Sequence, residues 1–233
     1  MLNVIKIGGS LAQNPQTLQA LCQKLNTLSN KHQIVIVPGG GKFADCVREA
    51  DKQFTLSKTT SHHMAILAMN QYGLLLADLM KPNSQTTDNL KTAKTKTHTD
   101  LITIFLPSKL LTQNNTKNKK DNKEGELPNS WEVTSDTIAA YIAKKLDAKK
   151  LVLIKNVDGI FTDNPKKEKQ PKLIEHLTTK ELFEKKNNTC TDTHLPNILK
   201  TLKINCHIIN GLYPNRIETT LNKQKTTGTI ISP

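Results

Sequence analysis

Two glycine clusters follow two short apolar runs near the start of the chain. Residues 8–10 (Gly-Gly-Ser) come two positions after Lys6, and residues 39–41 (Gly-Gly-Gly) precede Lys42. Glycine lets a backbone approach a phosphate group closely, and the start of a following helix adds free N–H groups and a favourable dipole. The two loops together predict a double phosphate site, and two tight turns without a ligand are the alternative. Neither loop has the P-loop or the Rossmann spacing.

Two polar segments in the second half of the chain could complete such a site. Asp136 follows Thr134 and Ser135 at a predicted helix start, where helix capping is the ordinary explanation. The functional alternative is a carboxylate that holds lysine side chains over a phosphate in transfer. Residues 155–163 (KNVDGIFTD) follow a predicted strand. Alone they could form any turn, and after two phosphate loops they fit a nucleotide pocket.

These segments are positioned by strand and helix signals that alternate along the chain. Short apolar runs predict strands at 2–7, 34–37, 101–107, 151–154, 206–209 and 227–232. Helical spacing predicts helices at 15–29, from about 44, at 61–80 and 135–146, and near 178–186 and 195–203. Strands that alternate with helices indicate an α/β fold with a mostly parallel sheet and helices on both faces.

Length and composition exclude several classes of protein. The 233 residues, 36% of them hydrophobic, suffice for one large α/β domain or two small ones. No apolar run approaches the roughly 20 residues of a membrane span. Four scattered cysteines without a C-x-x-C pair are typical of reduced cytosolic thiols rather than of disulfides or a zinc site. The first residues already have the pattern of a strand, so we expect no targeting segment and a cytoplasmic protein.

The formal charge of +13 has several interpretations. Nucleic acid, an anionic membrane and a phosphate-rich ligand would each fit, as would a compositional drift towards lysine. The lysines of 81–126 and 144–186 are mixed with acidic residues and do not alternate with aromatic residues, which disfavours a nucleic-acid surface. Residues 112–126 are of low complexity and predict a mobile surface loop. The 61–80 helix is apolar almost all round, which predicts burial or a homodimer or larger homo-oligomer.

Four segments in combination resemble the amino-acid kinase superfamily. They are KIGGSL, IVPGGGKFAD, TSDTIAAYIAKKL and VDGIFTDNP, and the resemblance extends nearly end to end, with 112–126 as an insertion. It implies a single domain, 1–233, folded as a three-layer α/β/α sandwich around a mainly parallel sheet. It further implies that the acceptor lies over the N-terminal half, about 1–127. ATP, with Mg²⁺, would lie over the C-terminal half, about 128–233.

The resemblance also implies roles for individual residues. Lys6 corresponds to the lysine on the transferring phosphoryl group, Asp136 to the carboxylate that organises the active-site lysines, and Lys200 to the second of these lysines. The implied nucleotide-binding residues are Gly8, Gly9, Ser10, Lys155, Asn156, Asp158, Gly159, Phe161 and Asp163. The implied acceptor-binding residues are Gly39, Gly40, Gly41, His62, Trp131 and Thr134. No side chain is assigned as a direct metal ligand.

Further motifs are similar to one subgroup of this superfamily. They include GGG-x-FA-x-x-V-R-x-x-D, a helix that begins with Ser-His, LPSK, and SW-x-x-TSD. That subgroup phosphorylates [5-(aminomethyl)furan-3-yl]methyl phosphate in methanofuran synthesis. The alternatives are a kinase of the same fold for another small phosphate or carboxylate, and a non-catalytic nucleotide- or oxyanion-binding protein.

One departure from the superfamily pattern concerns the proposed nucleotide loop. Members commonly read T-D-V-D-G, whereas this chain has Lys155 and Asn156 in place of the first two residues. Either Lys155 adds a phosphate contact, or it is simply exposed at the end of its strand.

Overall fold

The computed structural model describes the chain except for residues 97–99, 114–126, 129, 164–170 and 186–188. The predicted mobile loop at 112–126 therefore lies almost wholly outside the described residues. Only its first two residues are described, at the end of a short helix, α5 (Ser108–Gln113).

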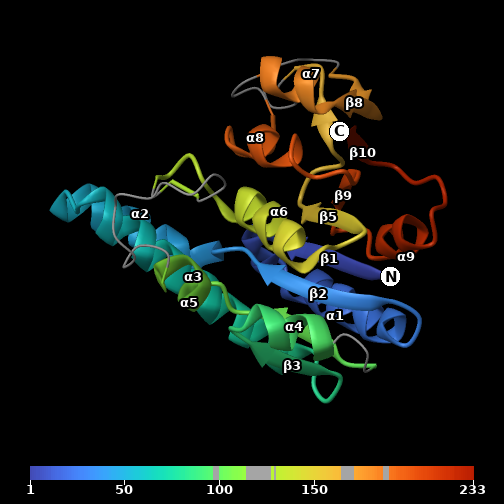
Figure 1. Cartoon of the computed structure of the whole chain (residues 1–233), viewed down its shortest axis with the longest axis horizontal. Helices are drawn as coiled ribbons and strands as arrows, with labels where there is room; N and C mark the ends of the chain where they lie inside the picture. Colours follow the sequence, from blue (N-terminus) through green and yellow to red (C-terminus); the bar gives the residue numbers. More distant parts are fainter. Residues whose placement is uncertain (97–99, 114–126, 129, 164–170, 186–188) are drawn as a thin grey trace.

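Eight strands form one sheet in the order β3-β4-β2-β1-β5-β9-β10-β8. Neighbouring strands are parallel except for β10, which runs antiparallel to β9. Because the strands of both halves of the chain share this sheet, their ends meet along common edges (Figure 1). The strands are β1 (Leu2–Ile7), β2 (Gln33–Pro38), β3 (Ser84–Thr87), β4 (Ile102–Phe105), β5 (Lys150–Lys155), β8 (His176–Thr178), β9 (Cys206–Asn210) and β10 (Thr229–Ser232). A separate pair joins β6 (Ile160–Phe161) to β7 (Leu173–Ile174).

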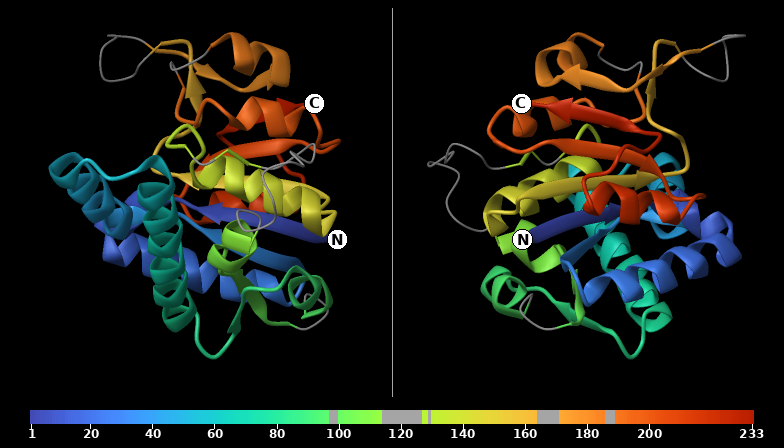
Figure 2. Two further views of the ribbon diagram at one scale, coloured as in Figure 1. Left: turned by 60° about the vertical axis from the view of Figure 1, so that its left-hand side comes forward. Right: turned by 90° about the vertical axis from the view of Figure 1, so that its right-hand side faces the viewer.

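Helices cover both faces of the sheet, which confirms the predicted three-layer α/β/α fold (Figure 2). Besides α5, the helices are η1 (Gly9–Gln13), α1 (Pro15–Ser29), α2 (Gly41–Phe54), α3 (Lys58–Leu79), α4 (Leu90–Lys96), α6 (Ser135–Leu146), α7 (Thr179–Glu184), α8 (Leu195–Leu199) and α9 (Asn215–Leu221). The apolar side chains of α6, α7 and α8 pack on one face, and those of α1 and α9 pack on the other. The helix α3 crosses the sheet edge and contributes to both layers.

The central strand β1 is buried along its whole length. Side chains alternate between the two faces of a strand, so Val4 and Lys6 point to the face that α6 covers, whereas Ile5 and Ile7 point to α1. A strand buried on both faces is ordinarily apolar throughout. Lys6 is therefore an exception that needs a partner on the α6 side.

Several short elements were not predicted from the sequence. The polar stretch between α3 and β4 contains β3 and α4, and the second half of the chain adds α9 and the β6–β7 pair. These elements are two to seven residues long. Neither a period of 3.6 nor a period of two can emerge over so few residues. The sequence of β3 is Ser-Gln-Thr-Thr at one edge of the sheet, and it has no apolar residue at all.

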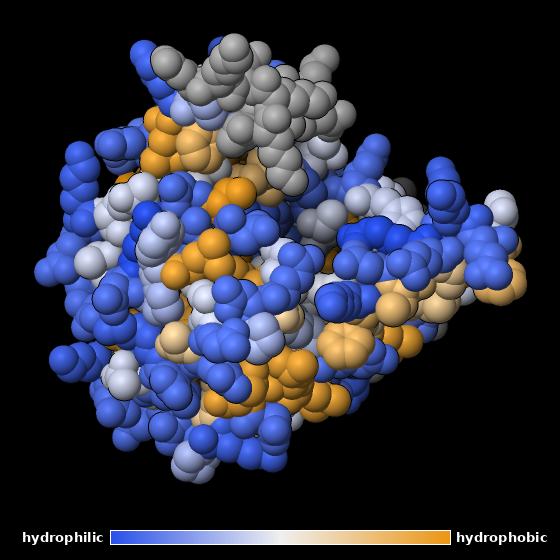
Figure 3. All heavy atoms as spheres, turned by 180° about the vertical axis from the view of Figure 1, so that it is seen from behind, coloured by the Kyte–Doolittle hydropathy of each residue, from blue (hydrophilic) through white to orange (hydrophobic). Residues whose placement is uncertain are grey.

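The long apolar helix begins at Lys58, three residues earlier than predicted, because the side chain of Ser57 accepts a hydrogen bond from the backbone N–H of Thr60. Leu67 and Leu74 are 44% and 54% exposed on this helix. Figure 3 shows the projecting α2–α3 arm from behind, with hydrophilic side chains along one side and hydrophobic ones along the other. The homo-oligomer stays a prediction. No helix among the described residues is long and apolar enough to span a membrane.

The two glycine loops touch each other through their backbones. Gly8 N–H donates to the carbonyl of Ile154 at 2.8 Å, and Gly39 N–H donates to that of Ile7 at 2.9 Å. A Cβ atom on Gly9 would lie 2.0 Å from the backbone nitrogen of Gly41. The carboxyl ends of β1, β2 and β5 are thereby joined into one backbone platform.

We expect Gly9→Ala to lower the free energy of unfolding by about 1–3 kcal/mol, the range typical of overpacking, because the added methyl group meets backbone that cannot yield locally. Chemical denaturation measures this change. Gln16→Ala, an exposed substitution on α1, is the control and should leave the midpoint unchanged. Equal stability of the two variants would contradict the close contact of the loops.

Candidate active site

A polar cavity of about 420 Å³ lies where the carboxyl ends of β1, β2 and β5 meet the start of α6. Both glycine loops contribute to its wall. Eight residues predicted for the site line it: Lys6, Gly9, Ser10, Gly40, Gly41, Thr134, Asp136 and Lys155. The sequence analysis gave no role to the other lining residues, which are Gln13, Lys42, Asp45, Arg48, Ser135, Thr189, Cys190, Thr191 and Asp192.

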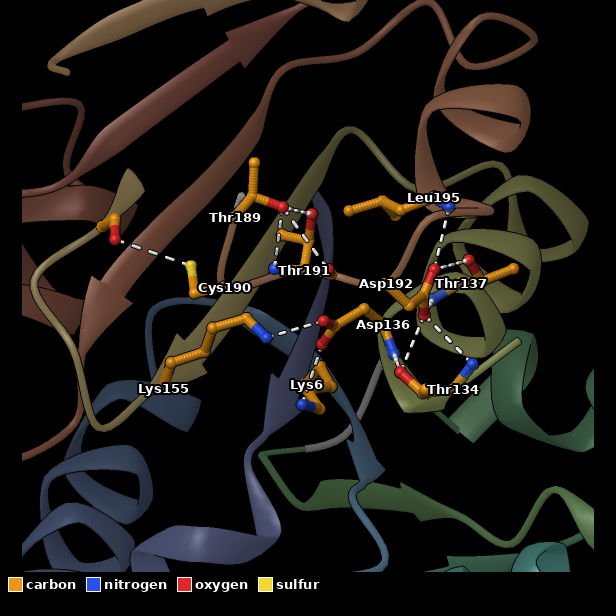
Figure 4. A network of polar contacts seen from close by, with 11 residues as sticks. Lys6, Thr134, Asp136, Thr137, Lys155, Thr189, Cys190, Thr191, Asp192 and Leu195 are labelled. Carbon is orange, nitrogen blue, oxygen red and sulfur yellow. Dashed lines mark hydrogen bonds and ion pairs between the residues drawn. The ribbon is translucent and has the colours of Figure 1, made fainter. Parts of the chain in front are cut away.

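Two lysines share one carboxylate in the wall of this cavity (Figure 4). Lys6 Nζ lies 2.8 Å from Oδ1 of Asp136, and Lys155 Nζ lies 2.6 Å from Oδ2. The three side chains are 7%, 11% and 3% exposed for Lys6, Lys155 and Asp136. Lys155 donates a hydrogen bond to Oδ2, and Lys6 forms an ion pair with Oδ1. The cluster therefore carries one net positive charge beside the cavity.

Burial and the attraction between opposite charges act against each other on the pKa values of this cluster. Burial by itself would raise the pKa of Asp136, but Lys155 and Lys6 hold that pKa well below its ordinary value. Burial opposes the charge of Lys155 as well, and Asp136 more than offsets it, so the pKa of Lys155 is raised. For Lys6 burial prevails over the attraction of Asp136, and its pKa is lowered. Lys6 is thus the ammonium group that gains most from an added anion.

Lys155 faces the interior, which contradicts the alternative that it is exposed at the end of its strand, and the phosphate contact stays a prediction. Its side chain points from the end of β5 towards Asp136 and is not exposed at the strand end. Because β5 lies beside β1 in parallel register, with Ile154 opposite Ile7, the two lysines reach Asp136 from adjacent strands.

The position predicted for Lys200 was wrong. This residue follows the last residue of α8 and is exposed, and its Nζ lies 4.8 Å from the centre of the Phe183 ring. The neighbouring Leu199 and Ile198 are buried, so the helix turns Lys200 outwards. The second lysine on Asp136 is Lys155.

Asp192 fixes the start of α6, and the sequence analysis assigned no role to it. Its carboxylate accepts hydrogen bonds from the backbone N–H and the hydroxyl of Thr134, and from both groups of Thr137, at 2.5–3.0 Å. It also accepts one from Leu195 N–H at 2.8 Å, at the start of α8. Asp136 lies between the two threonines, so Asp192 positions it. An aspartate three residues before a Leu-Pro helix start is the signal that could have found this residue.

The predicted nucleotide loop lies outside the 420 Å³ cavity. Asp158 accepts hydrogen bonds from Asn210 and Arg216, which lower its pKa although burial would raise it. Gly159 packs against Thr229, with room for no Cβ atom. Asn156 and Asp163 are exposed, and Phe161 is half-buried in β6.

The predicted acceptor residues His62 and Trp131 line a small hollow of about 60 Å³ beside the cavity. The Trp131 indole N–H donates to Asp51 at 3.0 Å, and the Arg48 guanidinium lies 5.3 Å from the centre of its ring. Burial lowers the pKa of His62, which favours the neutral imidazole. Gly40, Thr134 and Arg48 line both the hollow and the cavity, so the two spaces adjoin. Gly39 does not line either one.

Known proteins share the sequence pattern and the fold of this chain. The sequence matches the amino acid kinase family over residues 1–210. It is 32% identical over 216 residues to a [5-(aminomethyl)furan-3-yl]methyl phosphate kinase of Methanocaldococcus jannaschii, covering 93% of this chain and 91% of that protein. It is 28% identical over 185 residues to a uridylate kinase of Thermococcus kodakarensis, covering 78% and 74%. The fold resembles the crystal structure of the uridylate kinase of Archaeoglobus fulgidus, with a TM-score of 0.76, 20% identity and full coverage of both chains.

We expect Asp136→Asn to destabilise the chain by about 3 kcal/mol or more, because it leaves two buried ammonium groups without a counter-charge. The pKa of both lysines falls without the carboxylate. A lysine with a lowered pKa destabilises the folded state while it is protonated, so the deficit should shrink as the pH rises towards 10.5, the ordinary lysine value. Denaturant unfolding at several pH values measures this. Asp78→Asn, at an exposed carboxylate paired with Lys81, is the control.

Asp192→Ala should lower the free energy of unfolding by about 3 kcal/mol, because it frees five donors at the starts of α6 and α8. Hydrogen exchange should show faster exchange of the amides of Thr134 and Thr137, with slow exchange kept in β1. Unchanged protection of these two amides would contradict a positioning role for Asp192.

Proposed function

Since this chain belongs to the amino acid kinase family, we propose that it transfers the γ-phosphoryl group of ATP to a small phosphomonoester, [5-(aminomethyl)furan-3-yl]methyl phosphate. One observation carries the proposal. It is the pair of buried ammonium groups, Lys6 and Lys155, that share Asp136 beside two glycine loops in backbone contact.

Phosphoryl transfer requires alignment and positive charge rather than covalent help from the protein. Negative charge is spread over the equatorial oxygens of the transferring group, and fixed cations in a site that excludes water stabilise it well. Lys6 and Lys155 are fixed in this way, because each is tied to Asp136 and neither can swing away. We assign both lysines to the transferring phosphoryl group, and the backbone of Gly9 and Ser10 to its cradle.

The acceptor phosphate is assigned to the second glycine loop. The helix α2 begins at Gly41, the last residue of this loop. The dipole of its 14 residues and the free N–H groups of its first turn are directed at the cavity. Lys42 and Arg48 add two cations on the same helix, and Asp45, which pairs with Arg48, offsets one of them. An acceptor that already carries a phosphate must approach a second anion, and this end of α2 supplies charge to offset their repulsion.

The small hollow suits the organic part of the acceptor. It is lined by apolar side chains, among them Ile66, Met69 and Val133, together with Trp131 and the neutral ring of His62. A flat five-membered ring fits such a space better than a nucleoside does. The 32% identity to the furan phosphate kinase supports the same acceptor.

ATP and Mg²⁺ fit the residues present. The described residues contain no group of three or more His, Cys, Asp or Glu side chains that could hold a metal ion, and both oxygens of Asp136 face lysines. We therefore assign Mg²⁺ to the phosphate oxygens of ATP, where it supplies further neutralisation. The ATP base and ribose are assigned to the loop with Asp158, Gly159 and Phe161, whose strand β5 ends in the site at Lys155.

A kinase for a different acceptor is the main alternative, because uridylate kinases are among the relatives. A non-catalytic nucleotide- or oxyanion-binding protein is the second alternative.

With Mg-ATP and a panel of acceptors, we expect ADP to form fastest with the furan phosphate, ahead of uridylate, isopentenyl phosphate and acetylglutamate. Lys155→Ala should lower kcat by about a hundredfold or more, the loss typical of a single electrostatic donor. Lys200→Ala is the matched control and should keep the full rate, because its side chain lies on Phe183 away from the cavity.

The outcomes of this panel separate the hypotheses. Faster turnover of uridylate would replace the acceptor and retain the kinase. ATP binding by calorimetry without turnover of any acceptor would favour the binding protein. Equal rates for the two lysine variants would contradict the assigned roles.

The hollow can be tested separately. We expect Trp131→Ala to raise the KM for the furan phosphate about tenfold or more while leaving the KM for ATP unchanged, because one wall of the hollow is removed. Steady-state kinetics with each substrate varied in turn measures both constants. A change in the KM for ATP alone would contradict the assignment of this side to the acceptor.

A further inference from the structure

A second, larger cavity of about 690 Å³ lies at the other end of the sheet. It is lined by the start of β5 at Lys150, by β9 at His207, by α9 at Thr220, and by the segment that leads to β10. Figure 1 shows this segment arching away from β5 and β9 after α9. Lys150 and Lys155 stand at opposite ends of the six-residue strand β5, about 17 Å apart, so the cavity is distinct from the candidate active site.

The wall of this cavity is strongly cationic. Glu175 is the one acidic residue among the described lining residues. The basic lining residues are five lysines and two histidines: Lys149, Lys150, Lys203, Lys223, Lys225, His176 and His207. Lys149 pairs with Asp147, and Lys225 lies 3.5 Å from Glu175. Lys150, Lys203 and Lys223 have no ion-pair partner in the part of the chain that the structure describes.

Lys150 is held in place although it has no counter-charge. Its side chain is half-buried, and its ammonium group donates to the carbonyl oxygen of Thr220 on α9. Burial and the nearby charge of Lys223 both lower its pKa. Two like charges that face one cavity in this way create a local positive potential, which an anion would relieve.

Lys223 occupies an unusual backbone position. It follows the end of α9 with φ of 58°, in the left-handed region that favours glycine, while Gln224 N–H bonds to the carbonyl of Thr219 at 2.8 Å. The chain reverses at this residue and places the Lys223 side chain in the cavity wall.

The floor of the cavity is less polar than its rim. Ile204 and Ile230 are half-buried there, beside the ring of His207. Burial, together with the positive charges of Lys150 and His176, lowers the pKa of His207 to about 4. Its imidazole is therefore neutral near pH 7 and presents a flat, uncharged surface.

We propose that this cavity binds a small organic anion that carries phosphate groups, with the phosphates on Lys150, Lys203 and Lys223 and the organic part on Ile230 and the ring of His207. The shape favours a small molecule over a nucleic acid, because the cations converge on one cavity. No Phe, Tyr or Trp occurs among its described lining residues on which a series of bases could stack.

Two probes of different character test the proposal by calorimetry on the whole chain. They are ADP, with an organic part, and inorganic tripolyphosphate, without one. We expect two classes of site for ADP. Lys203→Glu with Lys223→Glu should weaken ADP binding to the cavity at least tenfold and leave ADP binding to the candidate active site unchanged. Lys155→Ala should weaken ADP binding to the candidate active site. Lys58→Glu with Lys91→Glu, an equal charge change at exposed lysines elsewhere, should leave both unchanged.

A second variant and a spectroscopic signal distinguish a loss of ADP binding from a loss of folding. Lys203→Gln with Lys223→Gln removes the charges without reversing them, and thermal unfolding checks that each variant folds. In the parent chain, the ring-proton NMR signals of His207 should shift on addition of ADP, and this shift should be lost in the glutamine variant.

Three results would overturn the proposal. One is a single class of ADP site that the double variants leave unchanged. Another is tripolyphosphate bound at the cavity as tightly as ADP, which would show a site for inorganic anions without an organic part. The third is displacement of ADP from the cavity by a short single-stranded oligonucleotide, which would show a nucleic-acid site.

Discussion

The buried contact of two lysines with one carboxylate is the interaction on which the rest of the site depends. Asp136 alone would be costly to bury, and so would either lysine. Together they are stable enough to remain inside, and one positive charge is left over. Because the three side chains are buried, the charge stays in one place, and the low dielectric of the interior strengthens its attraction for an incoming anion. Under the proposed function, the charge that acts on the transferring phosphoryl group comes from this imbalance rather than from the overall charge of +13.

This cluster joins parts of the chain that are far apart in sequence. Lys6 comes from β1, Lys155 from β5 and Asp136 from α6, and each is placed by a different physical cause. Strand alternation turns Lys6 towards α6, the parallel register of β1 and β5 brings Lys155 alongside, and Asp192 holds the first turn of α6. A change in any one of the three would separate the charges, so the fold and the site depend on the same contacts.

The sequence was most informative where a pattern was long and least informative where it was short. The α6 helix was predicted at residues 135–146, as found, because its apolar residues span three turns and Thr134 caps it. Lys6 and Asp136 followed from the glycine loops and the family motifs. Lys200 was misplaced because motif spacing does not reveal which face of a five-residue helix is buried. Asp192 was given no role, because its partners on Thr134 and Thr137 lie 55–58 residues away in the sequence.

Under the proposed function, the contact between Gly9 and Gly41 separates two properties of the active site. With the donor and the acceptor phosphate on the two loops as proposed, main-chain atoms determine the spacing between them, and most substitutions do not alter these atoms. The identity of the acceptor depends instead on side chains of α3 and of the segment around Trp131. A lineage can therefore exchange one acceptor for another by replacing a few side chains and keep the reaction distance unchanged. Such a division favours diversification of substrates on a conserved catalytic frame.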